Sequence, residues 1–357
     1  MKNKMLIVTM LALSIAAVGC SRTEDSASIR LLTQGSFAAG GTVVEATQAY
    51  NPLKPTAQAQ TLHGDHAYVF YQIPENARKI PLVFLHGAGQ SKKTWETTPD
   101  GRDGFQNLFV RKGFSTYLVD QPRRGEAGRS TVSSELTASP DEQFWFGQFR
   151  MGIWPTFFDG TQFARGDEAL EQFFRQMTPN TGAYDAQVIA DAMVAVLEKS
   201  GPSILVTHSQ GGGPGWLTGI KSPNVRAIVA YEPGSGFVFP EGEVPTPIAN
   251  NSFFGPLKAG SVSVEEFNAL TKMPIVIYYG DNIPAQAVTA PHQDYWRATV
   301  EMAKLWVETV NRHGGDASLI LLPDKGLKGN THFMFSDCNN VEVADVLMQW
   351  LKEKKLD

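Results

Sequence analysis

The chain lacks the features of disulfide-rich, nucleic-acid-binding, repeat and metal-binding proteins. It has only two cysteines in 357 residues, so a network of disulfides does not hold the fold together. Its lysines and arginines form no run longer than a pair such as Arg123-Arg124, and the net charge is −5, which argues against a nucleic-acid partner. The sequence contains no internal repeat, no low-complexity segment and no cysteine or carboxylate cluster spaced for a metal.

The composition is that of a globular protein with a large core. Hydrophobic residues make up 42% of the chain and charged residues 19%, and the length suits one large domain or two of ordinary size. A core of this size makes stability without a disulfide reasonable. We therefore predict that Cys338 is a half-buried apolar residue.

The first residues have the pattern of an export signal. Lys2 and Lys4 precede the apolar stretch 5–18, which is too short to span a bilayer comfortably, and Gly19-Cys20 follows. The sequence around Cys20 resembles a bacterial lipobox, which predicts a signal peptide over 1–19, a lipid on Cys20 and a tether over 20–28. The expected location is thus a membrane-anchored lipoprotein on the periplasmic or extracellular side. The alternative is a simple signal peptide with an incidental cysteine.

From about residue 29 onward, apolar β-branched runs alternate with helical patterns, which is typical of an α/β fold with a mostly parallel sheet. The carboxyl ends of such strands form the usual site. Predicted strands cover 31–44, 66–73, 80–85, 115–119, 204–206, 225–231, 274–279 and 318–322. Predicted helices cover 103–112, 184–199, 264–270, 295–312 and 340–352.

The stretch from about 130 to 182 breaks this alternation and is rich in aromatic residues. We interpret it as an inserted, mostly helical cap over the sheet. Most of its aromatic side chains should form the core of the cap, and some should line an apolar substrate pocket. They are Phe144, Trp145, Phe146, Phe149, Trp154, Phe157, Phe158, Phe163, Phe173 and Phe174.

One short stretch, 204–213, has the pattern of a strand, a tight turn and a helix start around Ser209. A serine on such a turn is lifted out of the sheet beside a helix N-terminus, where N–H groups favour developing negative charge. The usual pattern is Gly-x-Ser-x-Gly, and here Thr207 replaces the first glycine. Threonine is larger, so the turn has to accommodate a side chain at that position.

A serine nucleophile needs a base within hydrogen-bond reach and a carboxylate that orients the base. His332 follows the last predicted strand, and His292 is a second candidate base. Glu232 and Asp281 follow two neighbouring strands and compete as the acid. The backbone N–H groups of Ala88 and Gln210 are the expected oxyanion donors.

The motifs Leu85-His86-Gly87, Thr207–Gly211, Tyr231–Gly234 and Gly329–His332 resemble those of the α/β-hydrolase superfamily. They are most similar to secreted bacterial carboxylesterases whose acid follows the sixth strand. The resemblance implies a sheet of about eight strands, a cap, no metal and no organic cofactor. It also implies that Ser209 is the nucleophile, His332 the base and Glu232 the acid, within one domain over 29–357.

These observations predict a serine hydrolase that cleaves small or medium carboxylic esters through an acyl-enzyme. Amide or lactone hydrolysis remains an alternative, because a triad does not choose between leaving groups. The other alternative is a non-catalytic lipoprotein that keeps the fold in order to bind a ligand or partner, because a fold alone never guarantees chemistry.

Overall fold

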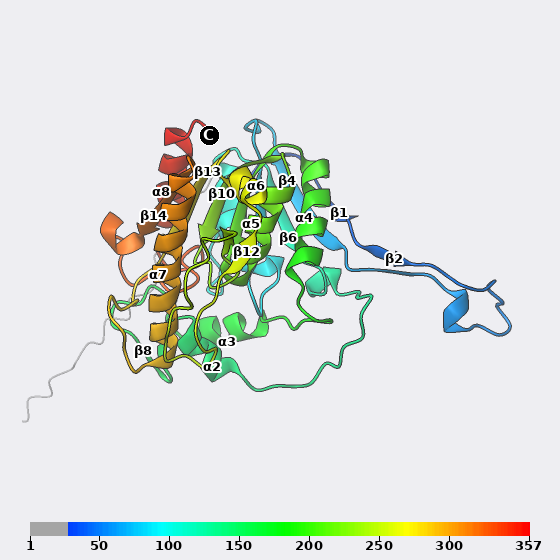
Figure 1. The fold of residues 1–357 in the computed structure, drawn as a ribbon, viewed down its shortest axis with the longest axis horizontal. Helices are drawn as coiled ribbons and strands as arrows, with labels where there is room; N and C mark the ends of the chain where they lie inside the picture. Colours follow the sequence, from blue (N-terminus) through cyan, green and yellow to red (C-terminus); the bar gives the residue numbers. More distant parts are fainter. Residues whose placement is uncertain (1–27) are drawn as a thin grey trace, which may run out of the picture.

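The computed structural model describes residues 28–357; the predicted signal peptide and Cys20 lie outside this range. An eight-stranded sheet crosses the molecule in the order β1-β4-β6-β5-β9-β10-β13-β14 (Figure 1). Its strands are β1 (Leu31–Ala39), β4 (Ala67–Pro74), β5 (Leu82–Leu85), β6 (Thr116–Asp120), β9 (Ser203–His208), β10 (Val225–Tyr231), β13 (Pro274–Tyr279) and β14 (Asp316–Leu321).

The sheet is mostly parallel, which confirms the predicted fold class. Only β1 with β4 and β4 with β6 pair antiparallel, and the five remaining neighbours pair parallel. Every residue of β5 and β9 is buried. Strands covered on both faces become continuous apolar runs, which is why the sequence pattern identified them.

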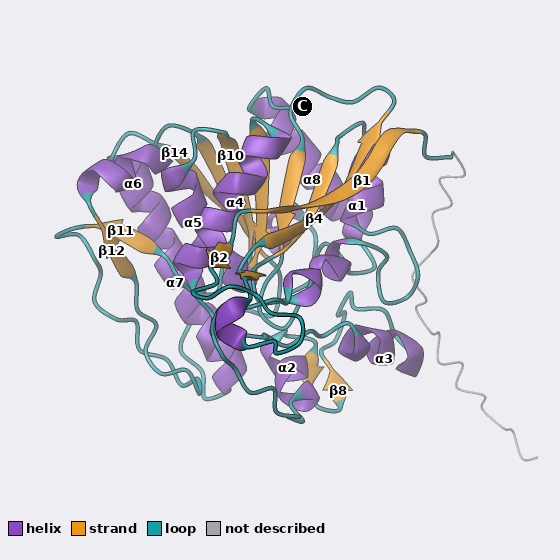
Figure 2. Cartoon of the chain, turned by 90° about the vertical axis from the view of Figure 1, so that its right-hand side faces the viewer, coloured by secondary structure: helices purple, strands orange, loops and turns teal. Residues whose placement is uncertain are grey.

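Helices pack on both faces of the sheet (Figure 2). One hydrophobic cluster joins the sheet to α4, α5, α6 and α7, and a second joins the other face to α1 and α8. The helices are α1 (Phe105–Arg111), α2 (Glu142–Gln148), α3 (Asp167–Arg175), α4 (Ala186–Ser200), α5 (Gly212–Lys221), α6 (Val264–Leu270), α7 (Pro291–Arg312) and α8 (Asn340–Glu353). Within residues 28–357, no helix has both the length and the apolar character needed to cross a membrane.

Local chemistry explains where several helices begin. The Asp185 side chain accepts hydrogen bonds from the first N–H groups of α4, and Ser263 with Glu266 forms a capping box at α6. The long helix α7 begins at Pro291, one turn before the predicted start at 295. Proline suits that first position because the N–H it lacks has no partner within the helix.

The predicted strand over 31–44 is two strands. Gly40 and Gly41 have φ values of +66° and +94°, and this turn separates β1 from β2 (Thr42–Val44). β2 pairs with β3 (Leu62–Gly64) in an arm that projects from the body of the molecule (Figure 1). A short helical turn, η1 (Ala57–Ala59), lies within this arm.

The aromatic-rich segment contains two short helices, α2 and α3, and the small hairpin of β7 (Gly152–Ile153) and β8 (Thr156–Phe157). These elements lie together beyond one end of the sheet strands (Figure 2). The rest of the segment is irregular, so it is less helical than its sequence predicts. A further two-stranded sheet pairs β11 (Val238–Pro240) with β12 (Gly260–Val262).

The prediction for Cys338 was half right. The residue is half-buried and packs against the second hydrophobic cluster. It is disulfide-bonded, however, rather than a free apolar side chain.

Candidate active site

Ser209 lies on the turn between β9 and α5, where it begins the short helical turn η4 (Ser209–Gly211). Its φ is +54°, a region that costs a non-glycine residue about 1–3 kcal/mol. The turn is crowded: a Cβ added to Gly87 would lie 2.6 Å from the Cβ of Ser209. A Cβ on Gly211 would lie 2.6 Å from the carbonyl oxygen of His86. Glycines at both positions therefore let the loop after β5 approach the serine.

Thr207 is accommodated by a glycine elsewhere in the chain. The threonine is fully buried, and a Cβ added to Gly215 of α5 would lie 2.7 Å from its Cγ2 atom. The strand and the helix can thus pack closely because the small residue, Gly215, lies on the helix instead of on the strand. The departure from the usual glycine pattern is structurally compensated.

His332 lies in the loop that precedes α8 and is buried. Its Nδ1 atom lies 2.5 Å from Oε2 of Glu232. Its Nε2 atom has no hydrogen-bond partner within the described part of the chain, and the residue lines the same cavity as Ser209. A carboxylate thus orients one ring nitrogen, and the other has no hydrogen-bond partner among the described residues.

The pKa of His332 lies below the ordinary histidine value of 6.5. Burial lowers it, and the hydrogen bond and negative charge of Glu232 offset that effect only in part. The imidazole is therefore neutral at pH 7. A neutral ring with a free Nε2 can accept a proton from a neighbouring group.

Glu232 follows β10 at a φ of +48° and is fully buried. Arg150 binds both of its carboxylate oxygens, with Nη1 at 2.8 Å from Oε2, and the N–H of Gly280 donates to Oε1 at 2.6 Å. Burial alone would raise the pKa of this carboxyl, but Arg150 and His332 outweigh it and lower the pKa to about 2. Glu232 is thus an anion at neutral pH.

Asp281 does not contact the histidine ring. Its Oδ2 accepts a hydrogen bond from the N–H of Gly329 at 2.7 Å, and its Oδ1 accepts one from the N–H of Asn282 at 2.7 Å. The Asp281 carboxylate therefore holds the start of the loop that carries His332 through this hydrogen bond to Gly329. The structure brings Glu232, and not Asp281, to the His332 ring.

The other histidines near the turn have structural partners. His292 bonds to the side chain of Gln148 and lines a different cavity. The Nε2 atom of His208 lies 3.0 Å from the carbonyl oxygen of His332, and the Nδ1 atom of His86 lies 3.0 Å from that of Gly87. Burial lowers the pKa of both His208 and His86, so each ring is neutral.

Ser209 and His332 open into a cavity of about 400 Å³ between the sheet, the cap and α7. Ala88 and Gln210, the predicted oxyanion donors, line it as well. Among the cap aromatics, Trp145 and Phe149 reach this cavity, whereas Phe146, Phe163 and Phe173 are buried in the second hydrophobic cluster. The remaining lining residues are Gln148, Gly234, Ser235, Phe254, Gly255, Pro256, Leu257, Lys258, Tyr295 and Trp296.

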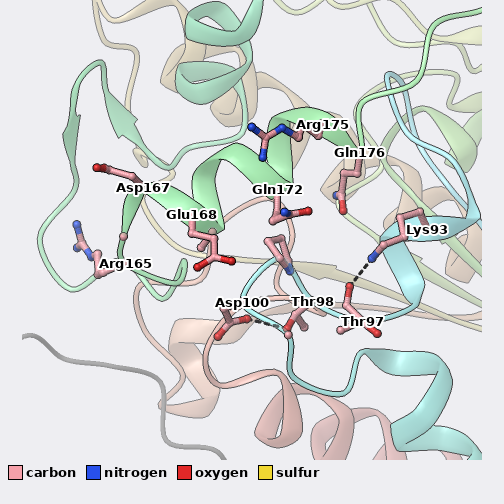
Figure 3. Close-up of a pocket in the computed structure, with 14 residues that line it drawn as sticks. Lys93, Thr97, Thr98, Asp100, Arg165, Asp167, Glu168, Gln172, Arg175 and Gln176 are labelled. Carbon is pink, nitrogen blue, oxygen red and sulfur yellow. Dashed lines mark hydrogen bonds between the residues drawn. The ribbon is translucent and has the colours of Figure 1, made fainter.

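A larger cavity of about 790 Å³ lies between α3 and the loop 93–101, away from Ser209. Charged side chains of both signs surround it, and Glu168 and Gln172 face the loop that carries Asp100 (Figure 3). Lys93 bonds to the carbonyl of Thr97, and Asp100 to the Thr98 hydroxyl. Neither Ser209 nor His332 lines it. Across residues 28–357, no group of His, Cys, Asp or Glu side chains is arranged to hold a metal ion.

Comparison with known sequences assigns the chain to a family. The sequence pattern of the Alpha/beta hydrolase family matches residues 82–346, which is most of the chain, so the protein belongs to that family. The matched region begins at β5 and ends within α8.

Two relatives resemble the chain over most of its length. A probable secreted lipase, phiG, from a fungus (Fungal sp., strain ATCC 74256) is 29% identical over 327 residues, which cover 80% of this chain and 86% of that protein. The solved structure of a novel bacterial esterase is 28% identical, with a TM-score of 0.71, and the match covers 92% of this chain and 97% of that one. The chain is thus an α/β hydrolase related to esterases and lipases.

Sequence reasoning missed the residues that support Glu232 and His332. Arg150 lies in the aromatic-rich segment, where its apolar neighbours are the only local signal that it is not a surface arginine. Asp337 is buried and accepts hydrogen bonds from the N–H and hydroxyl of Thr331, next to His332. Both contacts depend on tertiary packing, and an arginine among apolar residues is seldom buried unless it is paired.

Proposed function

We propose that this protein hydrolyses carboxylic esters, with Ser209 as nucleophile, His332 as general base and Glu232 as the orienting acid. The supporting observation is the position of His332: its Nδ1 is bonded to a buried carboxylate while its unpartnered Nε2 shares a cavity with Ser209. A serine hydrolase needs a base that a carboxylate orients and that shares the substrate cavity with the nucleophile, and these contacts supply such a base.

In the proposed reaction, Nε2 of His332 takes the hydroxyl proton of Ser209 as the oxygen attacks the ester carbonyl. The backbone N–H groups of Ala88 and Gln210 hold the resulting oxyanion. His332 then gives its proton to the departing alkoxide, and an acyl-enzyme remains. A water molecule, deprotonated by the same ring, attacks the acyl carbon and releases the acid and free Ser209.

The walls of the cavity favour small or medium esters with an apolar part. Aromatic side chains of Trp145, Phe254 and Tyr295 line it, and its volume of about 400 Å³ is at the small end of ligand pockets. The esterase and lipase names of the two relatives agree with this substrate class. Hydrolysis of amides or lactones uses the same machinery and is tested by the same substrate panel.

The test combines turnover with active-site labelling. Wild type, Ser209→Ala and the control Ser130→Ala are assayed with chromogenic esters of increasing acyl length, with matching amides and lactones, and with a serine-directed phosphonate. Ser209→Ala should lose turnover by roughly 10⁶-fold, by analogy with other serine hydrolases, and should not be labelled. Full labelling of Ser209→Ala, or a wild type inert toward every ester, amide and lactone tested, would reject the proposal.

The export signal and the secreted lipase relative together support an exported protein. Cys20 is the only cysteine besides Cys338, and its sulfur cannot carry both a lipid thioether and a disulfide, so within one molecule the lipid and a disulfide between the two cysteines exclude each other. We propose the lipid on Cys20 for the membrane-anchored form that the sequence predicts. Membrane fractionation and an intact mass that includes acyl chains, unchanged by a reducing agent, would support it. A soluble mature chain whose disulfide is lost in Cys20→Ser would overturn it.

A further inference from the structure

We propose that Arg150 is a positioning residue for the catalytic acid, supplied by the cap, so that seating the cap completes the Ser209–His332–Glu232 triad. This inference rests on the proposed function. Arg150 follows α2 and lies 82 residues before Glu232 in the sequence, yet its guanidinium grips both carboxylate oxygens. A paired fork of this kind fixes the orientation of a carboxylate as well as its charge.

Arg150 has no access to solvent, and its guanidinium contacts residues of three other segments. Its Nε donates to the carbonyl oxygen of Asp281 at 2.9 Å, and its guanidinium lies 5.0 Å from the ring centroid of Trp296. Its backbone φ is +55°, a conformation that persists only where the surroundings enforce it. The arginine thus joins the two strand-end loops that carry Glu232 and Asp281.

The two cap residues before Arg150, Gln148 and Phe149, support His332 directly and through Trp296. The carbonyl oxygen of Phe149 accepts a hydrogen bond from the N–H of His332 at 3.0 Å, and the two rings stack with an interplanar angle of 9°. The carbonyl oxygen of Gln148 accepts one from Nε1 of Trp296 at 2.6 Å, and the Trp296 ring contacts His332. Three consecutive cap residues therefore support both the acid and the base.

A gain in folding stability does not account for the buried Arg150–Glu232 ion pair. Two charges that are both fully buried lose their hydration, and replacing such a pair with apolar residues is often neutral or stabilising. Removing the arginine alone is different, because Glu232 would remain buried without a cation. The arrangement is therefore best explained by what it does for the carboxylate.

The charge of Arg150 also affects the proton affinity of His332. The positive charge lowers the pKa of the ring, and burial acts in the same direction. Without Arg150, the pKa of the coupled Glu232–His332 pair should rise, and this holds whichever of the two residues carries the proton. The other titratable groups around the Glu232–His332 pair are His208 of β9, Asp337 of the loop that carries His332, Tyr279 at the end of β13, and Tyr295 and Lys258 across the cavity.

The experiment compares Arg150→Met and Arg150→Lys with wild type and with Arg123→Met. Arg123 forms a similar fork with Asp65, is also buried and does not touch the triad, so it is a matched control. The readouts are kcat and KM for an ester, thermal unfolding, and NMR titration of the Nδ1 proton and ring of His332. The titration needs no turnover, so it reports on Arg150 even if the proposed reaction is wrong.

In Arg150→Met we expect kcat to fall roughly 10²-fold with little change in KM, because the base is misplaced. The pKa of His332 should rise, because the positive charge of Arg150 that lowers it is removed. Arg150→Lys keeps the charge but not the fork, so its titration should stay near that of wild type while kcat falls, and it also serves if the Met variant does not fold. Arg123→Met should change only thermal unfolding. If Arg150→Met and Arg123→Met show the same kcat and the same titration, Arg150 is only a structural ion pair and the inference is wrong.

Discussion

Two carboxylates lie at the ends of neighbouring strands, and they have different partners. Glu232, after β10, contacts two side chains, the Arg150 guanidinium and the His332 ring, besides the backbone N–H of Gly280. Asp281, after β13, contacts backbone N–H groups of its own turn and of the loop before His332. The comparison shows that a strand-end position does not define an acid. What defines it is the side chain that reaches the base.

Reach explains part of the difference. Glutamate has one methylene more than aspartate, and Glu232 uses it to place Oε2 against His332 while Oε1 binds the N–H of Gly280. The shorter side chain of Asp281 hydrogen-bonds to backbone N–H groups nearby, as aspartate side chains in turns commonly do. The proposed triad therefore depends on the longer acid on the more distant strand.

The largest expected effect separates the two acids directly. Glu232→Gln keeps the shape but removes the charge that orients His332, so kcat for an ester should fall roughly 10⁴-fold. Steady-state kinetics measure the loss, and circular dichroism checks that the variant is folded. Retention of most activity would remove Glu232 from the triad.

A smaller effect tests the role of reach. Glu232→Asp keeps the charge but withdraws the carboxylate by one methylene, so the contacts with His332, Arg150 and Gly280 cannot all form. We expect kcat to fall roughly 10²-fold, because small misplacements of catalytic groups have effects of that size. A variant as active as wild type would show that side-chain length is not what distinguishes the two acids.

The pH dependence of kcat/KM should distinguish the acids by direction. His332 must be unprotonated to act as base, so activity should rise with pH and reach half its maximum below pH 6.5, since burial lowers the pKa of the ring. Glu232 raises that pKa, so the midpoint in Glu232→Gln should move to a still lower pH. Asp281→Asn should leave it in place. A shift in Asp281→Asn alone would reverse the assignment.

The smallest effect is expected for Asp281→Asn. Asparagine can still accept one hydrogen bond, so the loop before His332 should loosen only slightly, with unfolding easier by about 1 kcal/mol and kcat reduced a few-fold. Thermal or urea unfolding measured beside kcat tests this. A loss as large as that of Glu232→Gln would contradict the contacts seen here.

Local patterns predicted the parts of the site that consecutive residues make. The buried run of β9, the turn at Ser209 and the glycines of α5 are contiguous, so one stretch specified strand, turn and helix. The parallel sheet followed from repeated apolar runs, and its eight strands match the prediction. The arm of β2 and β3 was missed because Gly40-Gly41 sits inside an otherwise strand-like segment, where a glycine pair only suggests a turn.

The sequence by itself determined the α/β class, the turn at Ser209, and a shortlist of candidate bases and acids. Periodicity and turn chemistry act over a few residues, and those features are local. Only the tertiary structure decided which acid meets His332, because Glu232 lies 100 residues away from it in the sequence. It also decided that Gly215 makes room for Thr207 and that the cap supplies Arg150. Such contacts arise when strand ends and cap converge on one cavity, and no local pattern encodes that convergence.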